Sequence, residues 1–276
     1  MVGTPLTIVP VSEDGSKRTH DTWAHLVRRL ARAVEPACST APSLLRVEAP
    51  TTSLKTSARG SGLRRREPSE VVVGELATLL RQGKFVLVHI DGDTVWSQRT
   101  TSTAVEHFDQ RVAEPVRKRL VAAIQLQARQ GGPHRRRQRP TASPAPEAPA
   151  PDAAAQAAAA LERLRLASPH YSVEAWLYQA TERATALARA HHDGRDVETF
   201  ETWARDRGAV DEVHGLPDTV CLGRHHNAEL AAALTAAVVD EVVGTGKSLA
   251  ACVDHLRRCA PLVAALRATS AAVSEE

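Results

Sequence analysis

The stretch "KFVLVHIDGD", Lys84–Asp93, joins a hydrophobic strand to a charged end. Its first half is an apolar, β-branched run, which is typical of a strand in a buried core. The run ends in two carboxylates, Asp91 and Asp93, with only Gly92 between them. Like charges this close repel each other, and one is partly protonated unless a cation lies between them. The stretch therefore predicts either a solvated turn or a metal site at the end of a buried strand.

Predicted strands and helices alternate along the first two thirds of the chain. Short apolar runs predict the strands, and apolar residues at helical spacing predict amphipathic helices between them. The predicted strands are Leu6–Val11, Leu44–Ala49, Phe85–Val88 and the "LRLA" run at 164–167, and the predicted helices include Trp23–Val34 and Val72–Leu80. This alternation indicates βαβ units and a mainly parallel central sheet flanked by helices. The C-terminal third is predicted to be a helical extension, with helices near 196–207, 227–241 and 247–268.

The composition is that of an ordinary soluble protein. The chain has 276 residues, of which 43% are hydrophobic and 24% are charged, which is enough for an ample core. The formal net charge of +3 is small, so the local clustering of basic residues is more informative than the total. No window approaches the ~18 consecutive apolar residues of a membrane span, and the N-terminal residues lack a signal-peptide pattern. Four cysteines without a C-x-x-C pair indicate reduced thiols, so we expect a cytoplasmic protein without a membrane partner.

One low-complexity segment divides the chain. Residues 129–156 are dense in Pro, Ala and Arg, a composition that predicts a disordered or extended insertion without a core of its own. We therefore expect the first part of an α/β core in residues 1–128. The rest of that core and the C-terminal helical region are expected in residues 157–276.

Three carboxylates are predicted to meet at one edge of the sheet. In parallel sheets, ligands bind beyond the carboxyl ends of the strands. Glu13 follows the first predicted strand, and Asp91 and Asp93 follow the third. Carboxylate oxygens suit Mg²⁺ or Mn²⁺, which proteins hold with a few carboxylates, waters and a substrate phosphate. Two such ions about 4 Å apart can activate water and stabilise the leaving oxygen in phosphodiester hydrolysis.

The motifs "TIVPVSEDG" and "VLVHIDGD" together resemble the TOPRIM (topoisomerase–primase) superfamily. A third segment, "LRLASPHYSVEAWLYQATERA", resembles the strand and helix start of a small stand-alone bacterial branch of TOPRIM-like proteins, many of them associated with phage-defence loci. The resemblance covers the first two thirds of the chain without the insertion. In that branch the equivalent glutamate is Glu174, with Trp176 packed beneath it. Two departures are Asp14 directly after Glu13 and the lack of an acidic residue after the leucine of "VEAWL".

The resemblance implies a Rossmann-like TOPRIM fold and a Mg²⁺- or Mn²⁺-dependent nuclease that hydrolyses nucleic-acid phosphodiesters. Under it, Asp91 and Asp93 bind metal, Glu13 binds metal or acts as a general base, and Glu174 is an additional ligand. It further implies an effector in bacterial anti-phage defence that a partner, commonly an ATPase, controls. The rival hypothesis is a non-catalytic TOPRIM-like scaffold, whose Ala- and Leu-rich C-terminal helices pack against a partner or a second copy. Convergence of the four carboxylates favours the nuclease, because a scaffold has no reason to gather like charges.

Two basic segments are candidates for binding nucleic acid. The run "RGSGLRRRE" contains Arg64, Arg65 and Arg66, which lead toward the strand that ends in Asp91. The loop "LGRHHNAEL" places Arg224, His225 and His226 at the entrance of a predicted helix, with Asn227 as a candidate N-cap. The alternative in both places is a solvated loop. "GTGKS", Gly244 to Ser248, is not a P-loop because position 241 is Glu rather than Gly. The spacing of Cys221, His225, His255 and Cys259 matches no common zinc module.

Overall fold

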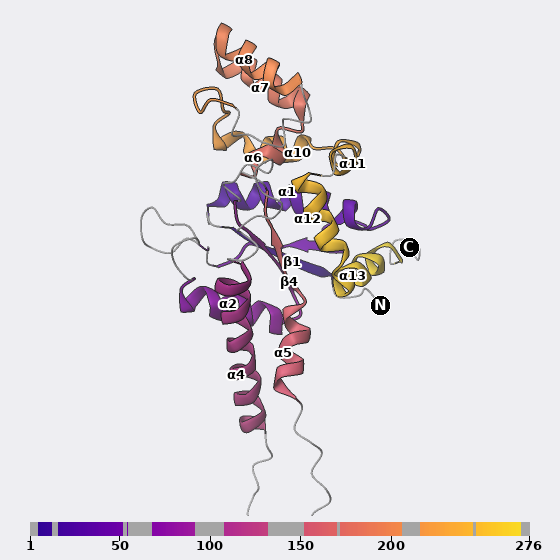
Figure 1. Ribbon diagram of the computed structural model, residues 1–276. Coiled ribbons are helices and arrows are strands. Elements are labelled where there is room, and N and C mark those ends of the chain that lie inside the picture. Colours follow the sequence, from indigo (N-terminus) through magenta and orange to yellow (C-terminus); the bar gives the residue numbers. More distant parts are fainter. Residues whose placement is uncertain are drawn as a thin grey trace, which may run out of the picture.

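The computed structural model describes residues 5–12, 16–51, 54, 68–91, 108–131, 152–169, 172–205, 216–244 and 247–271. Within these ranges the fold is α/β, with one central sheet in which every strand pairing is parallel (Figure 1). The strands are β1 (Leu6–Val11), β2 (Leu45–Val47), β3 (Phe85–His89) and β4 (Leu164–Ala167), in the order β2-β1-β3-β4. The predicted strands and the parallel sheet are therefore confirmed.

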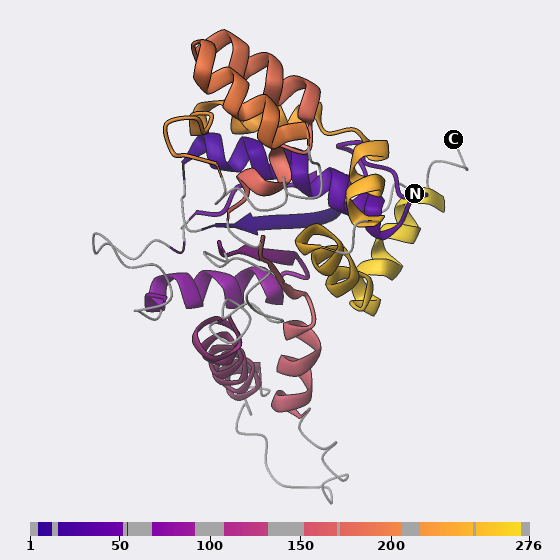
Figure 2. The same ribbon diagram turned by 45° about the horizontal axis from the view of Figure 1, so that its top comes forward.

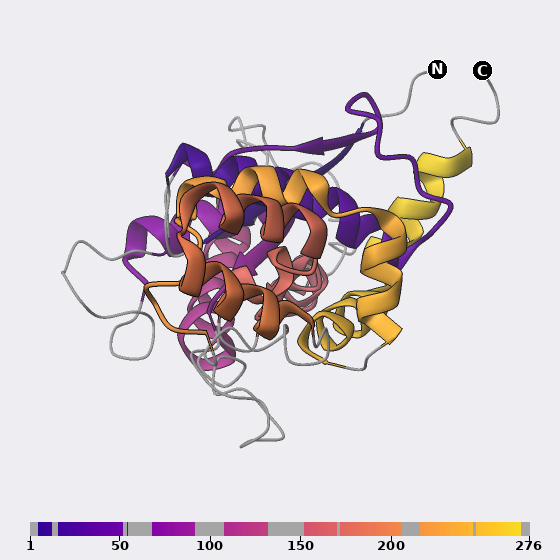
Figure 3. The same cartoon turned by 90° about the horizontal axis from the view of Figure 1, so that it is seen from above.

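Helices cover both faces of this sheet. The α-helices of the described residues, some of which pack on other helices rather than on the sheet, are α1 (Lys17–Val34), α2 (Glu70–Arg81), α4 (Glu114–Gly131), α5 (Ala153–Leu161), α6 (Glu174–Leu177), α7 (Thr181–His191), α8 (Gly194–Arg205), α10 (Asn227–Ala233), α11 (Ala236–Gly244), α12 (Ser248–Arg257) and α13 (Ala260–Ala271). Figures 1 and 2 show α1, α12 and α13 on one side of the sheet and α2, α4 and α5 on the other. The α7–α8 pair lies outermost, nearest the viewer in Figure 3.

The side chains of the central strands alternate between two hydrophobic cores. In β3, Phe85 and Leu87 join the core beneath α1, whereas Val86 and Val88 join the core beneath α2 and α4. This alternation follows from the two-residue period of a strand. Because both faces are covered, β3 consists of buried residues throughout, as expected for a parallel strand.

Pro10 lies in β1, which has neighbours on both sides, yet it breaks no backbone pairing. Leu6 donates its N–H to Leu44 and Ile8 accepts from Glu48, so alternate residues of β1 direct their backbone groups toward β2. Pro10 follows the same alternation, but β1 pairs with β2 only as far as Ile8. The missing N–H of Pro10 therefore points past the end of β2, where β1 resembles an edge strand.

A glycine-dependent turn joins α2 directly to β3. Gly83 has a φ of 79°, in the left-handed region that favours glycine. Its N–H donates to the carbonyl of Leu80, and the N–H of Lys84 donates to the carbonyl of Leu79. This pair of bonds is a Schellman motif, which ends the helix and satisfies two of its last carbonyls.

The C-terminal helices belong to the protein's own core. Leu230, Leu234, Val239 and Val242 are buried in the same cluster as α1, to which α10 and α11 are packed. This packing accounts for the apolar faces that the scaffold hypothesis assigns to a partner. The described residues thus give those helices a structural role within one chain.

Two predicted C-terminal helices are each divided in two. The segment 227–241 is interrupted at Leu234, after which the hydroxyl of Thr235 accepts a hydrogen bond from the N–H of Val238 and caps α11. The segment 247–268 is interrupted before Pro261, which lies in the first turn of α13. Proline is accepted in a first turn but would remove a hydrogen bond and clash within a continuous helix.

The low-complexity segment is helical at both described ends. Helix α4 runs to Gly131, and α5 begins at Ala153, inside the segment predicted to lack structure. The side chain of Asp152 accepts a hydrogen bond from the N–H of Ala154, and the following alanines have the highest helix propensity of all residues. Residues 132–151 lie outside the described ranges.

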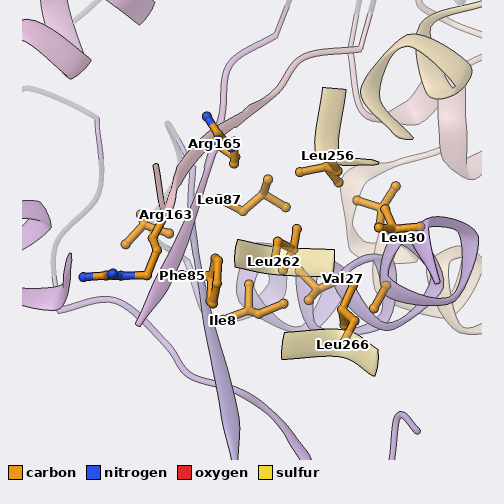
Figure 4. A pocket seen from close by; sticks show the side chains of 13 residues that line it. Ile8, Val27, Leu30, Phe85, Leu87, Arg163, Arg165, Leu256, Leu262 and Leu266 are labelled. Carbon is orange, nitrogen blue, oxygen red and sulfur yellow. The ribbon is translucent and has the colours of Figure 1, made fainter. Parts of the chain in front are cut away.

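A small apolar cavity lies between the sheet and helices α1, α12 and α13 (Figure 4). Its volume is about 20 Å³, and its lining includes Leu30, Phe85, Leu256 and Leu266. This volume is close to that of a single water molecule, and an apolar cavity of this kind stays dry. We interpret it as a packing defect rather than a ligand site. None of the helices in the described ranges is both long and apolar enough to cross a membrane.

We predict that Leu230→Ala destabilises the protein by about 2–5 kcal/mol, because Leu230 is fully buried where α10 packs on α1. Urea denaturation followed by circular dichroism measures the change. The matched control is Leu126→Ala on α4, where the side chain is 54% exposed and the expected change is within about 0.5 kcal/mol. Equal effects of the two variants would contradict the assignment of α10 to the core.

Candidate functional site

A polar cavity of about 700 Å³ lies at the carboxyl ends of β1 and β3. The chain leaves β1 toward β2 on one side and leaves β3 toward β4 on the other, so this is the switch point of the sheet. Crevices at such points are the usual ligand sites of parallel α/β sheets. The residues that line the cavity are Ser12, Ser16, Lys17, Arg18, Thr19, Thr22, Trp23, His89, Asp91, Val173, Glu174, Arg224, His225 and Asn227.

The N-terminus of α1 forms one wall of the cavity. Helix α1 begins shortly after β1, and its first residues, Lys17 and Arg18, are exposed at the cavity. Ser16 is the N-cap, and its hydroxyl accepts a hydrogen bond from the N–H of Thr19 at 3.3 Å. The positive end of the helix dipole and two cationic side chains therefore lie on the same wall.

The end of β3 contributes a histidine and a carboxylate. His89 and Asp91 are two residues apart, so both side chains project toward the face that α1 covers. The ring of His89 lies 4.6 Å from the ring of Trp23 on α1. His89 Nε2 and Asp91 Oδ1 are 3.0 Å apart, but their angles do not form a hydrogen bond. Neither of these buried atoms has a hydrogen-bond partner within the described part of the chain.

Glu174 enters the cavity from the start of α6 and is fixed by α10. Its Oε1 accepts a hydrogen bond from Asn227 Nδ2 at 2.8 Å. The interpretation of Asn227 as an N-cap is therefore wrong, because its side chain contacts Glu174 rather than the backbone of α10. His226 occupies the N-cap position and makes no capping hydrogen bond through its side chain. Asn227 is buried, and its Oδ1 has no hydrogen-bond partner among the described residues.

The loop before α10 holds Arg224 and His225 at the rim of the cavity. The hydroxyl of Tyr178 accepts a hydrogen bond from the N–H of Leu222 at 2.9 Å, and burial raises the pKa of that hydroxyl. Gly223 lies against the imidazole of His225, since a Cβ at this glycine would be 2.6 Å from His225 Cε1. The hydrogen bond to Tyr178 and the close approach of Gly223 to His225 help to position the loop that carries Arg224 and His225.

His226 does not line the cavity, and its predicted contact with nucleic acid stays a prediction. It is 8% exposed and packs against His225 and His191, at ring distances of 3.9 and 4.6 Å. Burial lowers the pKa of His226, and the neighbouring His225, His191 and Arg183 lower it further. Glu229 lies 3.7 Å from His226 but forms an ion pair with Arg183. In the described structure, the ring of His226 packs against those of His191 and His225.

Four of the predicted site residues line this one cavity although they come from distant parts of the sequence. They are Asp91, Glu174, Arg224 and His225. The other predicted acidic and basic site residues lie outside the described residues: Glu13, Asp93, Arg64, Arg65 and Arg66. Near Glu13, the described residues Ser12 and Ser16 line the cavity.

Sequence reasoning missed Lys17, Arg18 and His89. A detectable signal for the first two was the cap residue Ser16 followed at once by two basic residues at a helix start.

The described residues do not by themselves complete a metal site. Within those ranges there is no group of three or more His, Cys, Asp or Glu side chains that could hold a metal ion. Asp91 and Glu174 nevertheless offer the hard oxygen ligands that Mg²⁺ and Mn²⁺ prefer. Asp91 Oδ1 accepts no hydrogen bond within the described part, and the nitrogen 3.0 Å from it is His89 Nε2. These two residues fit a metal only as part of a larger ligand set.

Comparisons with protein-family models, with curated proteins and with solved structures find no match. The protein is therefore classified here only by its fold and by the cavity described above. It is a parallel α/β protein with a mixed-charge cavity at the switch point of the sheet.

We predict that Tyr178→Phe lowers the free energy of unfolding by about 1–3 kcal/mol. The substitution removes the oxygen that accepts the N–H of Leu222 and leaves a buried donor without a partner. Urea denaturation measures this loss. A change below about 0.3 kcal/mol would mean that another group takes over the hydrogen bond.

We predict that the stability of the protein decreases on acidification from pH 7.5 to 5.5, and that His226→Gln makes this decrease smaller. The folded state lowers the pKa of His226, so below about 6.5 the unfolded state binds more protons. The stabilising contribution of neutral His226 is present above that pH and is lost as the pH falls toward the folded pKa. Urea denaturation of both proteins at the two pH values measures the difference, and equal slopes would contradict the assignment.

Proposed function

We propose that the protein is a metal-dependent nuclease of TOPRIM type, which hydrolyses nucleic-acid phosphodiesters in the cavity at the switch point. The observation that carries the proposal is the meeting of Asp91 and Glu174 with Arg224 and His225 in one cavity. The carboxylates come from the end of β3 and the start of α6, and the cationic group comes from the loop before α10. Acidic and basic groups brought together in this way suit a divalent cation and a phosphate at the same time.

The carboxylates are the proposed metal ligands. Asp91 and Glu174 would hold Mg²⁺ or Mn²⁺ together with Glu13 and Asp93, which adjoin the cavity-lining residues in the sequence. A bound divalent cation lowers the pKa of water and stabilises negative charge on the leaving oxygen. The hydrogen bond from Asn227 fixes the rotamer of Glu174 and leaves its second oxygen for the cation. Such a supporting bond is typical of carboxylate ligands.

The basic residues of the rim are the proposed phosphate contacts. Arg224 and His225 are exposed at the cavity, so they can meet a nucleic-acid backbone without the cost of desolvating a buried charge. Contacts of this kind position the backbone and carry no sequence information. We propose the same role for Arg64, Arg65 and Arg66, which would release counterions from the nucleic acid when they neutralise its phosphates.

The cavity supports the nuclease better than the scaffold. A scaffold does not need Asp91 and Glu174 in one cavity with a buried histidine, since gathered carboxylates destabilise the fold when no cation binds. The C-terminal helices, which a scaffold would offer to a partner, are buried against α1. A role as an anti-phage effector under the control of an ATPase partner remains part of the proposal, on the basis of the TOPRIM resemblance.

The test of this function is metal binding and hydrolysis by the full chain. We expect calorimetry with Mn²⁺ to show binding in the micromolar to millimolar range, and Asp91→Asn with Glu174→Gln to weaken it at least about tenfold, because both variants remove a charged ligand. Cleavage of single- and double-stranded DNA and RNA in Mn²⁺ should fall at least about a hundredfold in the same double variant.

The control variant is Asp254→Asn on α12, an exposed carboxylate outside the cavity. It should bind Mn²⁺ and cleave nucleic acid as the wild type does. If the wild type binds no Mn²⁺ and cleaves none of these substrates while folding normally, the proposed function is wrong.

A further inference from the structure

The cavity has a second polar wall that the proposed hydrolysis does not use. This wall is formed by Lys17 and Arg18 in the first turn of α1, and both are exposed at the cavity; Arg224, a proposed phosphate contact of the hydrolysis, is exposed at the same cavity. Helix α1 has 18 residues, long enough for a developed dipole, whose positive end lies at this wall. Three cationic side chains and a helix N-terminus therefore line the same cavity, which is the arrangement that binds phosphate in many α/β proteins.

Buried polar groups indicate that the cavity is built for a ligand rather than for solvent alone. His89 is 5% exposed and lines the cavity; its Nδ1 has no hydrogen-bond partner among the described residues, and its Nε2 has only the contact with Asp91 Oδ1 at 3.0 Å, which is not a hydrogen bond. Asn227 also lines it, is 8% exposed, and has an unpartnered Oδ1 within the same ranges. Burying polar groups without partners costs free energy, and native proteins rarely leave them so unless a ligand or water completes them. These groups lie beside the α1 wall and are independent of it.

The size and charge of the cavity specify the class of ligand. A volume of about 700 Å³ lies within the usual range of small-molecule sites, about 300–1,000 Å³, and is suited to one nucleotide rather than to a duplex. A terminal phosphate carries about −1.5 to −2 charges at pH 7, more than the single charge of an internal phosphodiester. The cavity is also lined by two carboxylates, so its cationic side chains exceed its anionic ones by one (three against two), and the helix dipole adds to the positive side. This excess of positive charge matches the terminal phosphate better.

We propose that the first turn of α1, with Arg224, binds the terminal phosphate of a nucleotide whose sugar and base occupy the cavity beside His89 and Asn227. The choice of a nucleotide as the ligand rests on the nuclease function proposed above. The shared chemistry is a nucleoside monophosphate group, either as a free mononucleotide or as the phosphorylated end of a nucleic-acid strand. The site would then direct the enzyme to strand ends or to nucleotides.

The test is binding to the full chain in EDTA, without a metal, so that it does not depend on hydrolysis. The probes are AMP, adenosine, and a short oligonucleotide with either a 5′-phosphate or a 5′-hydroxyl. We expect AMP to bind at least about tenfold more tightly than adenosine, and Lys17→Ala with Arg18→Ala to remove most of this preference. Tighter binding of the 5′-phosphorylated oligonucleotide than of AMP would identify the strand end as the source, and the reverse order would identify the mononucleotide.

The matched control is Arg28→Ala with Arg32→Ala, which removes the same charge from α1 at positions that do not line the cavity. It should keep the preference for AMP. A second variant, Asp91→Asn, should strengthen AMP binding in EDTA because it removes a negative charge from the same cavity. Thermal unfolding of each variant shows that the fold is retained.

The inference is wrong if AMP and adenosine bind equally, if neither binds at millimolar concentration, or if the two double variants behave alike. None of these results bears on Mn²⁺ binding or on hydrolysis, because the AMP assay contains no metal. A wrong phosphate site can therefore be told apart from a wrong nuclease function. Conversely, phosphate-dependent AMP binding in a protein that binds no Mn²⁺ would support the phosphate site and reject the nuclease.

Discussion

The parallel pairing of β1 with β3 is the constraint on which the rest of the structure depends. It sets Ile8 against Phe85 and Val11 against Val88, and it ends both strands at the same edge of the sheet. The chain then leaves these two strands in opposite directions, which opens the cavity between them. A slip of one residue would exchange the two faces of β3 and turn His89 and Asp91 away from α1. The two hydrophobic cores prevent such a slip, because each accepts only one set of alternate side chains.

The polar cavity is stabilised by parts of the chain that are distant from the sheet. Glu174 is oriented by Asn227, and the rim loop is held by the hydroxyl of Tyr178. The side chain of Trp176 donates a hydrogen bond to Ser248 at the start of α12, so the "GTGKS" serine serves packing rather than phosphate binding. The α/β core alone would therefore supply only the α1 and β3 walls. The helical C-terminal region completes the site.

The sequence was sufficient to predict the sheet and part of the site, because those features depend on local patterns. The apolar run before Asp91 determined a strand, and the rule for parallel sheets placed Asp91 at the ligand edge. His226 and Asn227 could not be assigned in the same way. Their roles depend on His191 and Glu174, which lie far away in the sequence.

Single residues indicate the breaks within the predicted helices 227–241 and 247–268, but the helical spacing of apolar residues runs across both breaks. Pro261 and Thr235 are a helix breaker and a capping residue, but the apolar spacing continues across both. The same holds for α5, where alanine content was interpreted as low complexity although alanine favours a helix. In each case a single-residue preference decided the local structure, and the composition of the surrounding window did not.

The contact between α4 and α5 has a consequence for how the chain tolerates changes in length. The two helices pack against each other and lead away from the sheet, and 132–151 join them (Figure 1). The entropy of closing a flexible connection grows only with the logarithm of its length, so doubling it costs about 0.6 kcal/mol. The number of residues between the two helices is therefore weakly constrained by stability. The sheet and the packing of α4 against α5 should therefore survive a longer connection between these two helices.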